Sequence, residues 1–404
     1  MAYLNANATT PMYKAAAKLI GKLYRQAINV HADDKLAKSA AQNIQEFQAH
    51  VHTTFGYNSL FVSCASEANT MAMQSFATIH PTGTVVSTST EHSGMLLSIE
   101  FSKVSIVYIR PVGKVYNTLC PFLENIPVDK PVFVCVMHGN NETGYINDVV
   151  AIAQSIKKKR PNTHIHVDAS QTFCKIFTNR AMYDAGIDTV TVSFHKIRGP
   201  HLGMLLFADK AKLRPLIQGT QQGGLRGGTL SAPIISAAYY AYMRNMQNNT
   251  TYQAQLQHHR MAILQQLQAS PIKVIDVDAA KVSPDTWLQS RPDGSMFDAY
   301  AEYHIQIFGL NGADVLANTI LLVVYDPHGR FCNIECKAHL DTHDIIIGIG
   351  SACLTNKQTA SHIADVYNLN KLQKRGLLRL SFTPKLKNCE YAIGMLLAYL
   401  TKFI

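Results

Sequence analysis

The sequence has little cysteine for its length and no long apolar run. Eight cysteines among 404 residues are too few for a disulfide scaffold, so we expect reduced thiols. Cys332 and Cys336 are spaced like half of a metal clip, but no second pair matches them, and we interpret both as structural. No apolar segment approaches the roughly 20 residues that a membrane-spanning helix needs. These shortages argue against a disulfide-stapled secreted protein and against a membrane protein.

No targeting segment is visible in the sequence. The first residues run directly into the motif Asn7 to Pro11, which leaves no room for a presequence, and we expect a cytoplasmic protein. Hydrophobic residues make up 47% of the chain and charged residues 16%, as in ordinary globular proteins. The length allows two domains around a large core.

Acidic residues are the scarcer charge, with 27 Asp and Glu against 37 Lys and Arg, which gives a net charge of +10. The cations are scattered apart from the run Lys157 to Arg160, which we expect to end a helix, where cations suit the dipole. We therefore expect no direct nucleic-acid binding. A basic surface of this kind can instead attract an acidic protein partner.

The stretch that suggests chemistry is Ser193 to Pro200, between predicted strands at Asp188 to Val192 and Leu202 to Phe207. Its lysine, Lys196, lies beside Gly and Pro between two strands, where a solvated lysine is uncommon. Partial burial favours the neutral amine, which can then form a Schiff base with an aldehyde cofactor. Taken alone, the octapeptide is better explained by an ordinary surface lysine near a turn.

Asp168 ends a predicted strand, His164 to Asp168. In open α/β sheets ligands bind at the carboxyl ends of strands, and a carboxylate there would keep the ring nitrogen of pyridoxal phosphate protonated. A helix N-cap is the simpler interpretation of a single aspartate. Asp168 and Lys196 at the ends of successive predicted strands, 28 positions apart, favour the cofactor.

Eight short motifs follow one another along nearly the whole chain, from Tyr3 to about Leu400, and the match is weakest between Ile272 and Leu316. Together they resemble the cysteine desulfurases, which are pyridoxal phosphate enzymes of the class V aminotransferase-like group. The motifs are Asn7–Pro11, Ser63–Asn69, Glu91–His92, Asn140–Gly144, Val167–Gln171, Ser193–Pro200, Arg226–Leu230 and Gly350–Cys353.

The resemblance implies an α/β protein of the pyridoxal phosphate-dependent transferase fold (fold type I). This fold has a large domain with a mainly parallel sheet and a smaller α+β C-terminal domain. Alternating strand and helix patterns independently favour such a sheet with helices on both faces. A polar patch, Asn245 to Thr250, interrupts a long helical segment, Ile234 to Leu267. We therefore expect a large cofactor-binding domain at 12–250, and a small domain of 1–11 and 251–404 that carries the catalytic cysteine loop.

The predicted cofactor contacts fall at strand ends and helix starts. Ala65 and Ser66 open a predicted helix, where free N–H groups and the helix dipole favour a phosphate, although a plain N-cap serine explains Ser66 equally well. Asn140–Asn141 has a simpler interpretation as a turn. The resemblance implies further contacts: Asp168 at the ring nitrogen, Asn141 beside the ring, Gln171 at the phenolic oxygen, and Ser193 and His195 at the phosphate.

The glycine-rich segment from Gln222 to Thr229 suggests a second subunit. By glycine content alone it is a flexible loop, but in the family it crosses a homodimer interface and its threonine, here Thr229, contacts the partner's phosphate. The family usually carries a glutamate and an arginine where this chain has Gln222 and Gly223. We expect a homodimer whose interface differs in detail.

Cys353 and Arg379 carry the predicted substrate chemistry. Free cysteines are usually small buried residues, but the stretch around Cys353 is small and polar, and the family places its sulfur-accepting cysteine in this Gly-Ser-Ala-Cys setting. Arg379, 26 positions later, can clamp a carboxylate bidentately, and with Asn141 it matches the family's substrate-binding positions. Departures from the family are Asn5 in place of an aspartate, and Thr383–Pro384 where a glycine is usual.

The resemblance implies a pyridoxal phosphate-dependent cysteine desulfurase that converts L-cysteine to L-alanine and leaves a persulfide on Cys353. Lys196, with His92 assisting, would move the Cα proton, and the Cys353 thiolate would attack the substrate sulfur. The acceptor would be an iron–sulfur scaffold or a thiolation carrier. Two alternatives stay open. One is another enzyme of this fold, such as a selenocysteine lyase or an aminotransferase, and the other is a catalytically silent scaffold.

Overall fold

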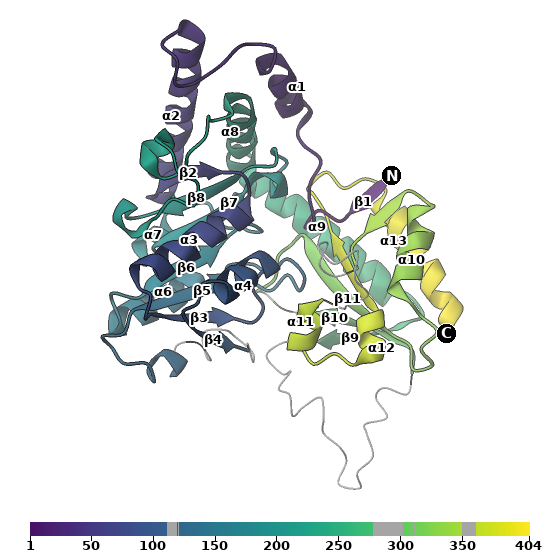
Figure 1. Cartoon of the computed structure of the whole chain (residues 1–404). Helices are drawn as coiled ribbons and strands as arrows, with labels where there is room; N and C mark the ends of the chain where they lie inside the picture. The colour runs from purple at the N-terminus through teal and green to yellow at the C-terminus, as the bar shows by residue number, and fades with distance from the viewer. Residues whose placement is uncertain (111–118, 120, 278–301, 311, 313, 350–360) are drawn as a thin grey trace.

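The computed structural model describes residues 1–110, 119, 121–277, 302–310, 312, 314–349 and 361–404. The described part forms sheets of seven, four and two strands. Figure 1 shows the seven-stranded sheet with its helices on one side of the molecule and the four-stranded sheet on the other, and both chain termini lie on the four-stranded side. We call these parts the seven-stranded region and the four-stranded region.

The seven-stranded sheet is mainly parallel, as predicted. Only β8 runs antiparallel to its neighbours, β2 and β7. The order across the sheet is β2 (Asn58–Val62), β8 (Gly203–Phe207), β7 (Thr189–Ser193), β6 (His164–Asp168), β5 (Val132–Met137), β3 (Thr84–Thr88) and β4 (Ser105–Ile109).

Helices cover both faces of this sheet because its strands carry apolar side chains on both faces. Val85, Phe133 and Leu205 face a core shared with α3 (Ala65–Ile79) and α4 (Ser93–Glu100). The next residue in each strand faces the other core. That core is shared with α2 (Lys35–Phe55), α6 (Val149–Lys159), α7 (Ala181–Asp184) and α8 (Ala232–Gln247).

The four-stranded sheet is mainly antiparallel, and only β9 runs parallel to its neighbour β10. Its order is β13 (Leu377–Ser381), β11 (Thr319–Tyr325), β10 (His304–Phe308) and β9 (Lys273–Val277). One face packs on α9 (Asn249–Gln268), α10 (Asn333–Asp341) and α13 (Cys389–Leu400). The other face lies against the short helices α11 (His362–Val366) and α12 (Lys371–Arg375).

The N-terminal arm joins the two regions. β1 (Ala2–Leu4) pairs in parallel with β12 (Ile345–Ile347), and α1 (Lys14–Leu23) then packs on α8. Beyond the end of α1, Ile28 packs against the core of the seven-stranded region.

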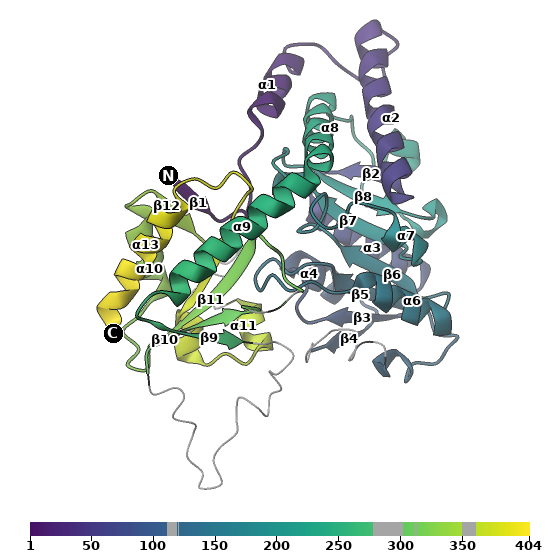
Figure 2. The same ribbon diagram turned by 180° about the vertical axis from the view of Figure 1, so that it is seen from behind.

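Two sequence-based predictions about helix ends are confirmed. The polar patch separates α8 from α9 at Asn248, and Figure 2 shows α9 running from α8 towards the four-stranded sheet. Lys157, Lys158 and Lys159 form the last turn of α6. None of the helices in the described ranges has both the length and the apolar character that a bilayer crossing requires.

Candidate active site

Asp168 and Lys196 lie at one edge of the sheet. Asp168 ends β6, which pairs in parallel with β7, and β7 leads into the 3-10 turn η1 (Phe194–Lys196). The Nζ of Lys196 donates hydrogen bonds to the carbonyl oxygens of Asn7 at 2.6 Å and Ala8 at 2.8 Å. The N-terminal arm therefore holds the lysine amine at the carboxyl ends of the strands.

Asp168 is 4% exposed and is fixed by neighbouring donors. Its carboxylate accepts hydrogen bonds from the Asn69 side-chain amide at 2.9 Å and the backbone N–H of Ser170 at 2.9 Å. The Asn69 oxygen lies 3.1 Å from Nε2 of His166, whose pKa burial lowers to about 3. Since Asn69 turns its nitrogen to Asp168, its oxygen accepts from His166, and the neutral His166 ring carries its proton on Nε2.

The start of α3 is open to an anion. Its N-cap, Cys64, is extended and supplies no side-chain cap, and Ser66 is exposed in the first turn. β8 passes so close that a Cβ at Gly203 would lie 2.3 Å from the carbonyl carbon of Cys64. Gly94, at the start of α4, also approaches closely, since a Cβ there would lie 2.8 Å from Ser66 Oγ. Free N–H groups at this helix start suit the phosphate predicted at Ala65 and Ser66.

Ser193, at the end of β7, and His195, just after it, lie at the same edge of the sheet. The Oγ of Ser193 is buried and has no hydrogen-bond partner among the described residues. His195 contacts Thr9 Oγ1 through Nδ1 at 3.1 Å and stacks on His201 with ring centroids 4.8 Å apart. Burial, with the nearby positive charge of Lys196, lowers the pKa of His195 to about 3, so its ring is neutral.

His92 is the N-cap of α4. Its Nδ1 accepts a hydrogen bond from the backbone N–H of Gly94 at 3.1 Å. Burial lowers the pKa of His92, so the neutral ring is favoured near neutral pH. With Nδ1 occupied as an acceptor, the neutral ring holds its proton on Nε2.

Arg379 lies on β13 and is 1% exposed. Its two terminal nitrogens donate to the carbonyl oxygen of Asn141 at 3.1 Å and the side-chain oxygen of Asn5 at 2.9 Å. Asn5 stands where the family has an aspartate, so it accepts this hydrogen bond without adding negative charge. The structure thus brings Arg379 and Asn141 together, and their role at a substrate carboxylate stays a prediction.

Asn7 is a site residue that the sequence indicated only as part of the motif Asn7–Pro11. Its carbonyl oxygen accepts from Lys196 and also from Nε2 of Gln171 at 3.1 Å. Its side-chain nitrogen donates to Thr319 Oγ1 at 2.8 Å and the Asn141 carbonyl at 3.0 Å. Asn7 therefore joins the lysine side of the site to the four-stranded region. The only sequence feature that pointed to Asn7 was its place in the first of the eight motifs.

The departure at Gln222 has a structural role. Its side-chain amide donates to the Phe61 carbonyl and accepts from the Phe61 N–H, both at 2.8 Å, and so pairs with the outer edge of β2. Arg226 forms an ion pair with Glu67 at 3.0 Å, which holds the following segment to the first turn of α3. Thr229, in that segment, is exposed.

The predicted catalytic Cys353 falls within 350–360, outside the described residues. Cys332 and Cys336 flank the start of α10, and burial raises the pKa of the Cys336 thiol to about 12. In the part of the chain that the structure describes, no three His, Cys, Asp or Glu side chains gather as a metal site would require.

The site residues fit pyridoxal phosphate. The buried Oγ of Ser193 and the buried Oε1 of Gln171 both lack a hydrogen-bond partner among the described residues. Buried polar atoms without partners are rare in proteins and call for a ligand or water. Ala65, Ser66, Ser193 and His195 would hold the phosphate, and Asp168, Gln171 and Asn141 would hold the ring.

Comparison with known proteins identifies the family of this chain. A family model described as Aminotransferase class-V matches residues 2–272. Cysteine desulfurase IscS of Buchnera aphidicola subsp. Schizaphis graminum is 29% identical over 244 residues, which cover 56% of this chain and 59% of that protein. The IscS of Vesicomyosocius okutanii is 26% identical over 310 residues, 73% of each chain. This chain therefore spans about three fifths of the length of the first of these relatives.

Solved structures share the fold over the whole chain. A NifS-like protein superposes with a TM-score of 0.79 at 20% identity and covers 100% of both chains. The NifS-like protein from Rickettsia africae gives a TM-score of 0.78 at 19% identity and covers 100% of this chain and 99% of its own. The predicted fold type I architecture is confirmed. The family match and the fold together show that this chain belongs to the class-V aminotransferase family of pyridoxal phosphate enzymes.

Proposed function

We propose that the protein is a cysteine desulfurase, a sulfurtransferase that converts L-cysteine to L-alanine and holds the sulfur as a persulfide on Cys353. The observation that carries the proposal is a series of hydrogen bonds that links Arg379 to Lys196. Arg379 and the side chain of Asn7 both donate to the Asn141 carbonyl, and the Asn7 carbonyl accepts from Lys196. Arg379 and Asn141, as a carboxylate-binding pair, would therefore hold the substrate beside the lysine. Relatives named cysteine desulfurase favour this activity over the aminotransferase and scaffold alternatives.

Each residue has a defined task in this proposal. Bound pyridoxal phosphate supplies an electron sink for charge that develops at the substrate Cα. Asp168, fixed by Asn69, holds the ring nitrogen in its protonated form. Lys196 moves the Cα proton, and His92, with its proton on Nε2, assists at the substrate. Arg379 binds the substrate carboxylate.

The sulfur step belongs to Cys353. Its thiolate attacks the substrate sulfur, and the new S–S bond forms as the C–S bond of the substrate breaks. The electron pair of the C–S bond stays with the carbon, which takes up a proton. Cysteine and one thiol thus become alanine and one persulfide, and the atoms and electrons balance without an outside oxidant.

The persulfide sulfur would pass to a protein acceptor, an iron–sulfur scaffold in cluster assembly or a carrier for thiolation. The IscS names of the relatives support a role in sulfur supply. We place the protein in the cytoplasm, where a reducing environment keeps thiols such as Cys353 available.

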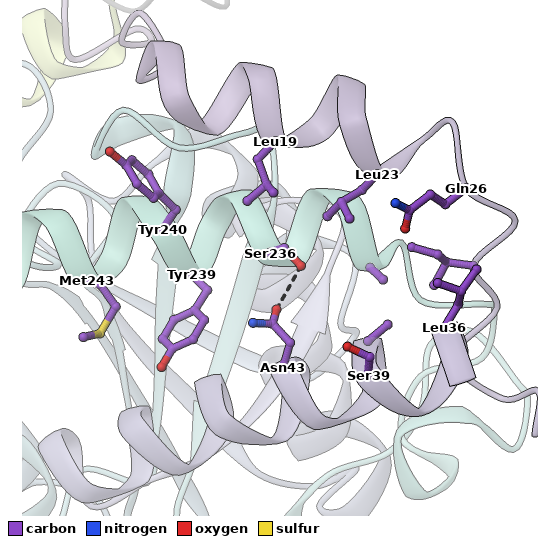
Figure 3. Close-up of a pocket in the computed structure, with 13 residues that line it drawn as sticks. Leu19, Leu23, Gln26, Leu36, Ser39, Asn43, Ser236, Tyr239, Tyr240 and Met243 are labelled. Atoms are coloured by element: carbon purple, nitrogen blue, oxygen red, sulfur yellow. Dashed lines mark hydrogen bonds between the residues drawn. The ribbon is translucent and has the colours of Figure 1, made fainter. Parts of the chain in front are cut away.

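We also propose a homodimer. Thr229 is exposed in the single subunit. A residue that contacts the phosphate bound by a partner subunit must be exposed in this way. On the same side, Tyr24 contacts Ser231 at 3.0 Å, and α1, α2 and α8 enclose a groove of about 500 Å³ (Figure 3). Apolar side chains dominate its lining, among them Leu19, Leu23, Tyr239, Tyr240 and Met243. A second copy would cover this groove, and light scattering should then show a dimer that Leu23→Glu weakens.

Two domains are part of the same proposal, with the large one at 12–250 and the small one made of 1–11 and 251–404. The separate apolar cores of the seven-stranded and four-stranded regions support this division.

The test of the activity is alanine and sulfide formation from L-cysteine in the presence of a reductant. Native protein should be yellow and form both products, whereas Cys353→Ala should keep its colour and lose turnover. A yellow native protein that leaves cysteine unchanged would contradict the proposed substrate. A colourless protein in the presence of pyridoxal phosphate would contradict the role of Lys196.

A further inference from the structure

Asn5, in the N-terminal arm, contacts the buried Arg379 through an uncharged group. The Nη2 of Arg379 donates to the side-chain oxygen of Asn5 at 2.9 Å. A guanidinium has only donors, so it is the amide oxygen of Asn5 that faces it. An aspartate here would offer an oxygen in the same place together with a full negative charge. Asn5 therefore accepts a hydrogen bond from Arg379 without forming an ion pair with it.

Backbone contacts hold Asn5 at this place. The strand that precedes it, β1, pairs with β12. After it, the N–H of Ala6 donates to the carbonyl oxygen of Ser381 at 2.8 Å, and the N–H of Asn7 donates to Ser381 Oγ at 2.9 Å. Because backbone atoms of the arm make these contacts, a carboxylate of the same shape as the Asn5 amide should leave the arm where it is.

The charge of Arg379 also acts on Tyr3 and Glu142. Burial raises the pKa of both residues, and the nearby positive charge of Arg379 acts in the opposite direction. The Tyr3 hydroxyl donates to the Thr9 carbonyl at 2.9 Å, and the Glu142 carboxyl accepts from Ser361 Oγ at 2.6 Å. Burial thus disfavours negative charge on these neighbours. Asn5 is the contact where one change of side chain would place a carboxylate directly on the guanidinium.

We infer that Asn5 is a specificity-determining residue that acts through Arg379. Its neutral amide favours free amino acids, which carry an ionised α-carboxylate, over the amides and esters of the same amino acids. This inference rests on the proposed function, in which Arg379 binds the substrate carboxylate. An aspartate in contact with the guanidinium would offset the charge that attracts this carboxylate and would also repel it.

Two ligands that differ in the charge of the carboxyl end separate this electrostatic role from a structural one. L-alanine, the proposed product, and L-alaninamide share the same side chain, and neither has a thiol, so no sulfur is transferred during the measurement. Each ligand is titrated against the visible absorbance of the holoenzyme at one pH. The native protein should bind L-alanine more tightly than L-alaninamide.

Asn5→Asp should raise the midpoint for L-alanine by roughly tenfold to hundredfold, because the new carboxylate opposes that of the ligand. The midpoint for L-alaninamide, which has no such charge, should not rise. The family has an aspartate at this position, so the variant should fold. Asn5→Ser keeps an uncharged acceptor and should bind both ligands as the native protein does. Asn368→Asp is the matched control, because the Asn368 oxygen also accepts from an arginine, Arg110, and it should have native midpoints.

An unchanged midpoint for L-alanine in Asn5→Asp would overturn the inference. So would an equal rise for both ligands, a comparable rise for L-alanine in Asn5→Ser, or a loss of cofactor absorbance, because each result would show a structural role. Equal midpoints for the two ligands in the native protein would overturn the carboxylate-binding role of Arg379, and this inference with it. A native protein that distinguishes the two ligands but leaves L-cysteine unchanged would overturn the proposed activity alone.

Discussion

Asp168 in the seven-stranded region and Arg379 in the four-stranded region are both buried charges, but their partners come from different parts of the molecule. Asp168 binds Ser170, two positions away, and Asn69 on α3, a helix that packs on its own sheet. Arg379 binds Asn5 and Asn141, which are 374 and 238 positions away and belong to the N-terminal arm and the seven-stranded region. The partners of Asp168, on the cofactor side of the proposed site, therefore come from one sheet and its helix, whereas the partners of Arg379, on the substrate side, come from outside its own sheet.

Changing the arginine should break the substrate side alone. Arg379→Lys keeps the charge but loses the planar fork, and hydrogen bonds to charged groups contribute about 1.5–3 kcal/mol, so KM for cysteine should rise roughly tenfold to hundredfold. Steady-state kinetics and the visible spectrum measure the two sides separately. The exposed Arg375→Lys on α12 is the control. An unchanged KM, or a lost cofactor spectrum, would contradict the separation of the two sides.

The residues at strand ends were more predictable than the residues held by long-range hydrogen bonds, for a physical reason. Asp168 and Lys196 end adjacent parallel strands, so periodicity and turn residues in the sequence already place them at one sheet edge. The roles of Asn7 and Gln222 depend on hydrogen bonds to residues that are 134 or more positions away, and no local pattern encodes such a contact.

The cofactor side should respond to a change that leaves the substrate side intact. Asn69→Ala leaves the buried Asp168 carboxylate and His166 ring each without one partner, which should lower the free energy of unfolding by about 1–3 kcal/mol and weaken cofactor binding. Denaturant titration with and without pyridoxal phosphate measures both effects. Asn125→Ala, an exposed asparagine that also donates to a backbone carbonyl, should leave both unchanged. Equal stability of the two variants would show that the Asn69 link is unimportant.

Acid should weaken the seven-stranded region through its buried histidines. Burial lowers the pKa of His164 to about 4 and of His166 to about 3. Below the ordinary pKa of about 6.5 the unfolded chain binds protons that the folded chain does not, so stability falls as pH falls from about 6.5 towards about 4. One such histidine contributes a slope of at most about 1.4 kcal/mol per pH unit.

Denaturant midpoints at about pH 7 and about pH 5 measure this slope. His164→Asn should flatten it, whereas the exposed His31→Asn should leave it as in the native protein. The same slope in both variants would assign the acid sensitivity to other groups.

The most direct test of the proposed activity is the mass of the Cys353 peptide after native holoenzyme reacts with L-cysteine without a reductant. The proposed mechanism predicts that this peptide gains one sulfur atom and that one alanine forms for each sulfur gained. An unmodified Cys353 peptide, or sulfur found instead on another thiol such as the exposed Cys64, would contradict the assignment of Cys353 as the sulfur carrier.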